Sequence, residues 1–131
     1  MALILVVDDE VQVRAALRAM LESAGHKVHE AAGGREATVA VLRDRVPDLV
    51  ITDILMPDHD GIDAILTIRQ MYGDLPIIAI TGSAFADLDL DTAKAFGATR
   101  ALVKPIRRDV LLSAVSECLA ANPGPESNSP T

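Results

Sequence analysis

The sequence predicts an α/β fold in which a doubly wound parallel sheet is covered by helices on both faces. Three short runs are almost entirely apolar, as is typical of strands buried on both faces of such a sheet; they are residues 3–7, 49–53 and 77–80. Segments with apolar residues at helical spacing separate the runs, and this alternation indicates right-handed strand–helix–strand units. The core must be aliphatic, because 50% of the residues are hydrophobic but only 2% are aromatic.

The remaining elements can be assigned in chain order. Residues 11–24 carry apolar side chains at helical spacing, and Gly25 ends that helix, as glycine commonly does just past a helix. Residues 27–31 alternate between polar and apolar side chains, which predicts a weaker edge strand. We expect further helices at 35–44, 62–72, 92–96 and 108–121, an acidic loop at 87–91 and a last strand at 100–104.

Length and charge restrict the class of protein. The 131 residues are expected to form one domain, followed at 122–131 by a disordered tail or linker rich in Pro, Gly, Ser and Asn. The net charge of −7 argues against nucleic acid or a membrane surface as a direct partner, because both favour clustered Lys and Arg. Cys118 is the only cysteine, so no internal disulfide can form. Without a secretory signal or a bilayer-length apolar run, the sequence predicts a cytoplasmic protein.

Polar residues that could carry chemistry lie at or just beyond the carboxyl ends of the predicted strands; they are Asp8, Asp9, Asp53, Thr81 and Lys104. These ends share one edge of a parallel sheet, so residues distant in the sequence converge there. If the strand order is 2-1-3-4-5, the first and third strands are neighbours about 4.8 Å apart, which places Asp8 and Asp9 beside Asp53. Lys104 then starts about 10 Å from Asp53, a gap that a lysine side chain can largely bridge.

This set of side chains suits phosphoryl chemistry. Three carboxylates at one edge repel one another, and only a cation or protonation relieves the repulsion. Oxygen ligands without His or Cys favour Mg²⁺, or Mn²⁺ in its place. Asp53 is then the expected nucleophile, because a carboxylate can form an aspartyl phosphate. Thr81 could donate to a phosphoryl oxygen, and Lys104 would face the same group. The alternative for Asp53 alone is a simple cap on the following turn.

In its motifs the sequence resembles the receiver domain of two-component response regulators, including the chemotaxis regulators. The motifs are the Asp8-Asp9 pair, Asp53 followed by Met56-Pro57 and Gly61, Thr81-Gly82, and Gly97-Ala98 leading to Lys104-Pro105. Five motifs in order at compatible spacing are highly specific, and the likeness covers about residues 3–119. It implies a flavodoxin-like fold with five parallel strands in the order 2-1-3-4-5, and a receiver domain at residues 1–121.

The resemblance also implies a role for each site residue. Mg²⁺ would be held by Asp8, Asp9, Asp53 and the backbone carbonyl of Leu55. Asp53 would accept a phosphoryl group from a histidine kinase or phosphotransfer protein, and Lys104 would pair with it. Thr81 would report phosphorylation to a downstream effector that the sequence does not identify. The peptide bond at Lys104-Pro105 would be cis. Such a domain is a signalling switch that catalyses only its own phosphorylation and dephosphorylation.

Two other classes remain open. Ala101 stands three residues before the lysine, where family members usually carry Tyr or Phe, and this departure favours an interaction module that keeps the fold without switching. A phosphatase of the haloacid dehalogenase type shares the aspartyl nucleophile and the metal. That class, however, has its nucleophile in an Asp-x-Asp motif on the first strand, whereas Asp8 and Asp9 are adjacent and Asp53 lies at the end of the third strand.

Overall fold

The computed structural model describes residues 2–43, 46–54, 60–82, 91, 94–95 and 97–121. In these residues the chain forms β1 (Leu3–Val7), α1 (Val11–Ser23), β2 (Lys27–Ala31), α2 (Gly34–Arg43), β3 (Leu49–Asp53), α3 (Asp60–Met71), β4 (Ile77–Thr81), β5 (Arg100–Val103) and α5 (Arg108–Ala121). The helix expected at 92–96 is described only at Lys94 and Ala95, which are helical. Leu55, the Met56-Pro57 motif, most of the expected acidic loop and the expected tail at 122–131 lie outside the described residues.

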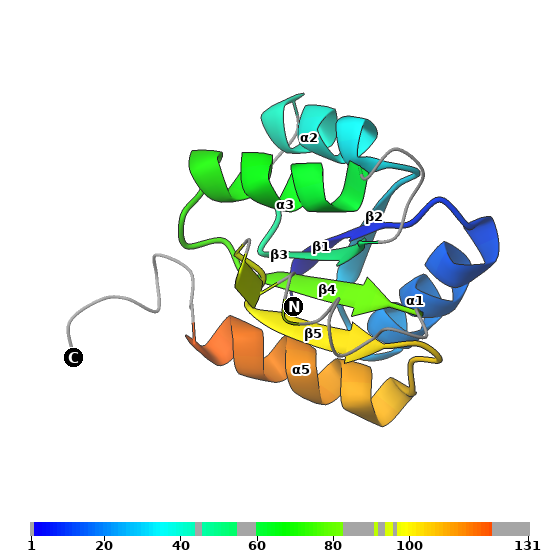
Figure 1. Ribbon diagram of the computed structural model, residues 1–131. Coiled ribbons are helices and arrows are strands. Elements are labelled where there is room, and N and C mark those ends of the chain that lie inside the picture. Colours follow the sequence, from blue (N-terminus) through cyan, green and yellow to red (C-terminus); the bar gives the residue numbers. More distant parts are fainter. Residues whose placement is uncertain are drawn as a thin grey trace.

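The five strands form one parallel sheet in the order β2-β1-β3-β4-β5, which confirms the expected topology. Helices α2 and α3 cover one face of the sheet, and α1 and α5 cover the other (Figure 1). Successive side chains of a strand point to opposite faces. Accordingly, Leu5 and Val7 of β1 pack on the side of α2 and α3, whereas Ile4 and Val6 pack on the side of α1 and α5.

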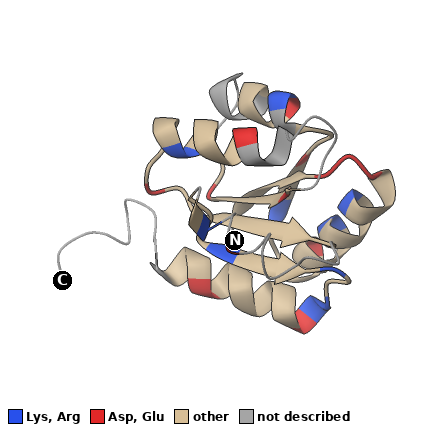
Figure 2. Cartoon of the chain, viewed as in Figure 1, with Lys and Arg blue, Asp and Glu red and all other residues tan. Residues whose placement is uncertain are grey.

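The apolar runs of the sequence are the central strands. Every residue of β1, β3 and β4 is buried, because helices cover both faces of these strands. The edge strands β2 and β5 keep some side chains exposed, and charged residues lie on the helices, the loops and these edges (Figure 2). Cys118 of α5 is 2% exposed within the aliphatic core, as its position on an apolar helix face predicts.

Element boundaries differ from the expected ones by one or two residues, which is the usual uncertainty of helix and strand ends. Helix α1 stops at Ser23, because the amide of Ala24 turns back to the carbonyl of Leu21 and Gly25 adopts a φ of 90°. Helix α3 begins at Asp60, where polar residues precede the first apolar position of the pattern. Strand β4 continues to Thr81, which pairs with Val103 of β5.

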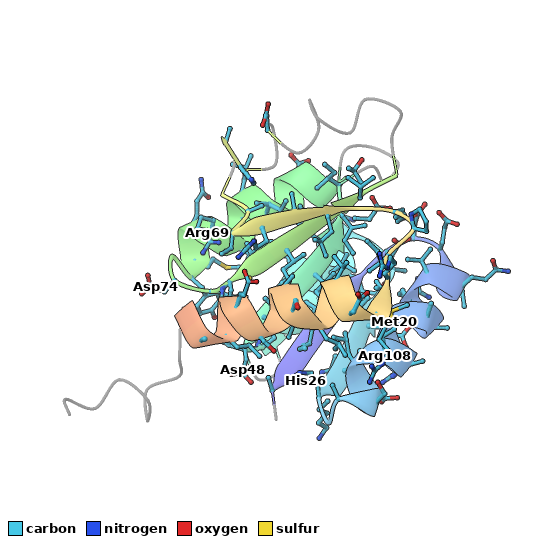
Figure 3. The ribbon with its side chains drawn as sticks, turned by 90° about the horizontal axis from the view of Figure 1, so that it is seen from below. Met20, His26, Asp48, Arg69, Asp74 and Arg108 are labelled. Carbon is cyan, nitrogen blue, oxygen red and sulfur yellow. The ribbon has the colours of Figure 1, made fainter. Side chains whose placement is uncertain are left out.

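The start of β1 is fixed at the amino-terminal edge of the sheet. The amide of Ala2 donates to His26 Nδ1 at 3.2 Å, and the amide of Leu3 donates to Asp48 Oδ2 at 2.8 Å. His26 and Asp48 flank the beginning of this strand (Figure 3). The polar residues expected to carry the chemistry, among them Asp8 and Asp53, lie at the opposite, carboxyl-terminal ends of the strands. No helix within the described ranges has the length and apolarity required to cross a bilayer.

Candidate functional site

The carboxyl ends of β1, β3, β4 and β5 meet at one edge of the sheet (Figure 1). In the register of β1 with β3, Val7 lies opposite Thr52, so the next residues along the two strands, Asp8 and Asp53, are neighbours. Asp8 is 1% exposed and Asp53 is 4% exposed. The parallel sheet therefore brings two buried carboxylates together from positions 45 residues apart, as the strand order predicted.

Asp8 is held through its backbone and its side chain. Its amide donates to the carbonyl of Ala31 at 3.1 Å, which ties it to the end of β2. Its carboxylate Oδ1 accepts the amide of Glu10 at 2.8 Å, directly before α1 begins. This bond satisfies the amide of the residue directly before α1 and fixes the loop between β1 and α1.

Lys104 reaches both buried carboxylates. Its Nζ lies 3.1 Å from Asp53 Oδ2 and 3.2 Å from Asp8 Oδ2. Burial by itself would lower the pKa of Lys104, but hydrogen bonds and charge from Asp53, and then from Asp8, outweigh burial and raise the pKa above its ordinary value. The side chain remains a cation that neutralises part of the acidic cluster. The expectation that the lysine side chain bridges the gap across β4 is confirmed.

Thr81 and Gly82 lie between Lys104 and the end of β3. Thr81 is fully buried at the end of β4, and its carbonyl accepts the amide of Lys104 at 2.7 Å. A Cβ atom on Gly82 would lie 3.3 Å from Lys104 Cδ, so the absence of a side chain lets the lysine pass over the end of β4. The peptide bond between Lys104 and Pro105 is cis, as the resemblance implied.

Oxygen ligands for a cation gather in the loop between β1 and α1. Asp8, Asp9 and Glu10 each offer a carboxylate oxygen, and these oxygens lie within 4.8 Å of one another. Figure 2 shows the acidic residues of the loop between β1 and α1 in red, at the carboxyl-terminal ends of the strands. The pattern of strand ends predicted Asp8 and Asp9 but not Glu10, although Glu10 directly continues the acidic run. Leu55, the fourth expected ligand, lies outside the described residues.

These ligands fit Mg²⁺. Mg²⁺ binds one or two carboxylates and keeps several waters. Asp8 is buried and fixed, whereas Asp9 and Glu10 are exposed and leave room for water on the outer side. No histidine or cysteine takes part in this described cluster, and this agrees with a hard cation rather than zinc.

A groove of about 740 Å³ opens beside the buried carboxylates. Asp53, Gly82 and Lys104 line the groove together with Glu10, the residues of α1 between Gln12 and Met20 that face it, and the two residues after Lys104. The apolar part of the lining consists of Val13, Ala16, Leu17, Met20, Pro105 and Ile106. Asp53 and Lys104 therefore form part of the wall of a groove whose lining is otherwise largely apolar.

Comparison with known proteins agrees with this geometry. The family model described as the response regulator receiver domain matches residues 4–116. The protein PilH of Pseudomonas aeruginosa is 36% identical over 124 residues, covering 92% of this chain and 99% of PilH. The chemotaxis protein CheY4 of Vibrio cholerae has a solved structure with a TM-score of 0.81 and 34% identity, covering 91% of this chain and 99% of that chain.

Longer relatives contain a similar segment. The transcriptional regulatory protein ZraR of Klebsiella oxytoca is 36% identical over 117 residues, which are 89% of this chain but 26% of ZraR. The C4-dicarboxylate transport transcriptional regulatory protein DctD of Pseudomonas aeruginosa is 35% identical over 116 residues, which are 88% of this chain and 25% of DctD. The chain thus spans about a quarter of the length of these two relatives. By its sequence, its sheet order and its acidic edge, the chain belongs to the family of response regulator receiver domains, the signalling switches of two-component systems.

Proposed function

We propose that Asp53 is the phosphoacceptor of this receiver domain and that Lys104 and the Asp8-Asp9 pair neutralise the charge of the phosphoryl group. The contact of Lys104 Nζ with Asp53 Oδ2, at 3.1 Å, is the observation that carries the proposal. A lysine fixed beside the buried Asp53 carboxylate provides a cation where a phosphoryl group on Asp53 would lie.

The transfer follows from this arrangement. An Asp53 carboxylate oxygen attacks phosphorus, the bond between phosphorus and the imidazole nitrogen of a phosphohistidine breaks, and its electron pair stays with the imidazole. Such a transfer depends mainly on positioning and on charge neutralisation. Mg²⁺ held by Asp8, Asp9, Asp53 and the Leu55 carbonyl would supply further neutralisation of the phosphoryl oxygens. Lys104 donates to the phosphoryl group, and the Thr81 hydroxyl binds one of its oxygens and thereby senses it.

The donor is a histidine kinase or a phosphotransfer protein, since response regulators receive phosphate from histidine kinases. Its phosphohistidine approaches Asp53 through the groove beside α1. Residues 1–121 form the receiver domain and residues 122–131 a tail or linker. The domain acts in the cytoplasm without binding nucleic acid itself, and the only reactions that it catalyses are its own phosphorylation and dephosphorylation.

Intact mass after incubation with acetyl phosphate tests the proposal. The expected result is a single Mg²⁺-dependent phosphoryl adduct on the wild-type chain, absent from Asp53→Asn. Asp63→Asn, which alters an exposed aspartate of α3, is the matched control and should keep the adduct. An adduct that persists in Asp53→Asn would refute Asp53 as the acceptor. Steady hydrolysis of p-nitrophenyl phosphate would instead favour a phosphatase.

A second candidate function rests on Ala101. This residue packs against the core on the side of α2 and α3 and pairs with Ala79 of β4, so a methyl group stands where relatives usually carry an aromatic ring. The candidate is an interaction module that does not switch. Amide chemical shifts of the phosphorylated chain distinguish the two functions: changes confined to the residues around Asp53 favour the module, and changes that spread along β4 and β5 favour the switch.

A further inference from the structure

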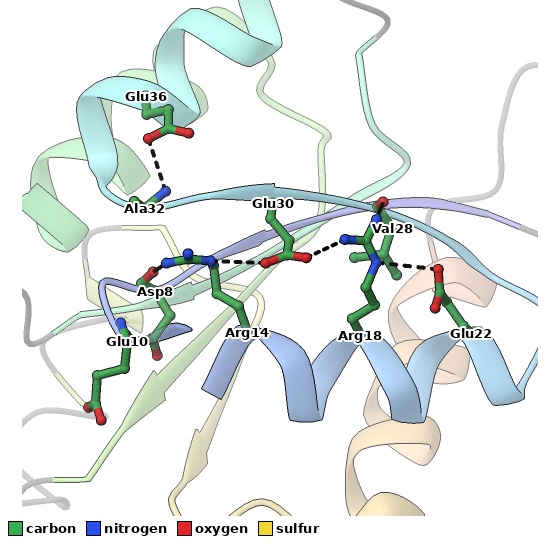
Figure 4. Close-up of polar contacts among 9 residues, drawn as sticks. All are labelled: Asp8, Glu10, Arg14, Arg18, Glu22, Val28, Glu30, Ala32 and Glu36. Atoms are coloured by element: carbon green, nitrogen blue, oxygen red, sulfur yellow. Dashed lines mark hydrogen bonds and ion pairs between the residues drawn. The ribbon is translucent and has the colours of Figure 1, made fainter. Parts of the chain in front are cut away.

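Arg14, which is not among the proposed Mg²⁺ ligands, holds the backbone of one of them. Its Nη1 donates to the carbonyl of Asp8 at 2.6 Å, and its Nε donates to Glu30 Oε1 at 3.0 Å (Figure 4). The Arg14 side chain is 14% exposed and that of Glu30 is 26% exposed. Little water competes for the guanidinium, and a hydrogen bond from a charged donor is stronger than one from a neutral donor.

The same part of β2 holds Asp8 from both sides. The amide of Asp8 donates to the carbonyl of Ala31, and the carbonyl of Asp8 is linked through Arg14 to Glu30, the preceding residue of β2. Both backbone polar groups of Asp8 are therefore fixed to one strand. Arg14 belongs to α1, so its bond to the Asp8 carbonyl also joins the first turn of this helix to the loop between β1 and α1.

The carbonyl of Asp8 determines where Asp9 starts. A peptide group is planar, so fixing the direction of this carbonyl fixes the plane of the Asp8-Asp9 peptide and the position of the Asp9 Cα. The Asp8 and Asp9 carboxylates lie in one group whose oxygens are within 4.8 Å of one another. We propose that Arg14 is a positioning residue for the Mg²⁺ site: held by Glu30, it aligns the Asp8-Asp9 peptide so that the two carboxylates converge. This inference rests on the function proposed above.

Arg18 provides a matched comparison on the same helix. It lies one turn after Arg14, forms an ion pair with the same Glu30 carboxylate and donates to the carbonyl of Val28 at 2.7 Å (Figure 4). Arg18 also forms an ion pair with Glu22, one turn further along α1, at 3.3 Å. Arg18 therefore shares the charge, the helix face and the acidic partner of Arg14, but its contacts lead along β2 away from Asp8.

Electrostatics and positioning predict opposite effects of removing Arg14. Deleting a positive charge beside a cation site reduces repulsion, so Coulomb interactions alone would tighten Mg²⁺ binding. Releasing the Asp8 carbonyl would let the two carboxylates drift apart and would weaken binding. Loss of an outer partner of a metal ligand typically costs about 10–100-fold in metal affinity. The sign of the change therefore separates the two explanations.

The test is the dissociation constant of Mg²⁺, measured by isothermal titration calorimetry on the wild-type chain, Arg14→Met and Arg18→Met at one ionic strength. Methionine keeps much of the apolar stem and removes the donors. We expect binding about tenfold or more weaker in Arg14→Met and within about twofold of wild type, or tighter, in Arg18→Met. In a Mg²⁺ titration followed by NMR, the amides of Asp9 and Glu10 should shift less in Arg14→Met.

Unchanged or tighter binding in Arg14→Met would overturn the inference, and so would an equal weakening in both variants. If Arg14→Met does not fold, Arg14→Gln takes its place, because the glutamine amide nitrogen stands at the position of Arg14 Nε beside Glu30 but the Nη1 donor to the Asp8 carbonyl is missing; wild-type affinity in that variant would likewise overturn the inference. Failure of the wild-type chain to bind Mg²⁺ would be a different result, since it would refute the proposed function itself.

Discussion

Asp53 ends β3 and Lys104 follows β5, two strands that are not neighbours, yet Lys104 Nζ lies 3.1 Å from Asp53 Oδ2. Strand β4 separates the two, and the lysine crosses its end over Gly82. The crossing depends on the missing side chain at that position. The amine is also held by Asp8, so the lysine is fixed at its backbone, along its stem and at its charged end.

Gly82→Ala should slow phosphorylation. The new Cβ would lie 3.3 Å from Lys104 Cδ and 3.5 Å from Lys104 Cβ, so the stem must move by a few tenths of an ångström while its amine is held by two carboxylates. We expect phosphorylation by acetyl phosphate to be about tenfold slower, because misplacing a catalytic group by 1 Å can cost 100-fold. Intact mass at timed quench points measures the rate.

Gly73→Ala is the control for this substitution. A Cβ on Gly73 meets nothing within 4 Å, so the variant adds the same methyl group in open space. Both variants should keep the free energy of unfolding within about 1 kcal/mol of wild type, as is usual for exposed positions. Equal rates for Gly82→Ala and Gly73→Ala would mean that the Lys104 stem has room to adjust.

Lys104→Met should destabilise the chain most when Mg²⁺ is absent. The substitution leaves Asp8 and Asp53, which are 1% and 4% exposed, without the ammonium that they share. Removing one partner of a buried ion pair is strongly destabilising, and we expect a loss of about 3 kcal/mol in the free energy of unfolding. Saturating Mg²⁺ should recover part of the loss, because a ligand that binds only the folded state stabilises it.

Urea unfolding with EDTA or with Mg²⁺, followed by circular dichroism, measures this effect. Lys94→Met removes an exposed lysine outside the site and serves as the control. If Lys104→Met and Lys94→Met unfold alike in EDTA, Lys104 does not relieve the repulsion between the two carboxylates.

Arg69 of α3 should contribute strongly to stability on the face of the sheet opposite α5 (Figure 1). Its guanidinium donates to the carbonyls of Gly73, Leu75 and Gly97 at 2.7, 2.6 and 2.7 Å, and it thereby joins the turn before β4 to the turn before β5. Hydrogen bonds from charged groups contribute more than neutral ones, so Arg69→Met should lower the free energy of unfolding by about 2 kcal/mol.

Arg100→Met is the matched control for Arg69. Arg100 pairs with Glu117, and both side chains are about half exposed, at 49% and 52%. Exposed ion pairs contribute little, so this variant should lose no more than about 0.5–1 kcal/mol. Urea midpoints measured side by side decide the comparison, and a similar loss in both variants would rule out the special role of Arg69.

The sequence was sufficient for those parts of the site that depend on strand ends. Apolar runs that end in Asp8, Asp53 and Thr81 predict a shared edge, because parallel strands place their carboxyl ends on the same side. The order of the strands followed from the family motifs and is confirmed by the register of β1 with β3.

The contacts of Glu10 and Arg14 could not be predicted in this way. Arg14 binds a backbone carbonyl, and no pattern of residue types identifies which carbonyl a long side chain reaches. Its position depends on how α1 starts after Glu10 and on how closely Glu30 approaches from β2. These are consequences of packing rather than of local sequence. The carbonyl of Leu55 and the fate of Thr81 on phosphorylation stay predictions.

The stability of the chain should rise with pH through the titration of His26. Burial lowers the pKa of His26 from its ordinary value of 6.5, and its Nδ1 accepts the amide of Ala2 at 3.2 Å, which requires an unprotonated nitrogen. At pH values around and just below 6.5 the unfolded chain therefore binds more protons than the folded chain. Stability is then present above this range and is lost as the pH falls through it.

The free energy of urea unfolding, measured from pH 5 to pH 8, should thus decrease more steeply toward acid in the wild-type chain than in His26→Gln, which does not titrate. His29→Gln removes an exposed histidine from β2, three residues further along the chain, and should retain the steep wild-type slope. Every other titratable group is common to the wild-type chain and His26→Gln, so the difference between these two proteins isolates the contribution of His26. Parallel curves for the wild-type chain and His26→Gln would show that the contact with Ala2 does not depend on the protonation of His26.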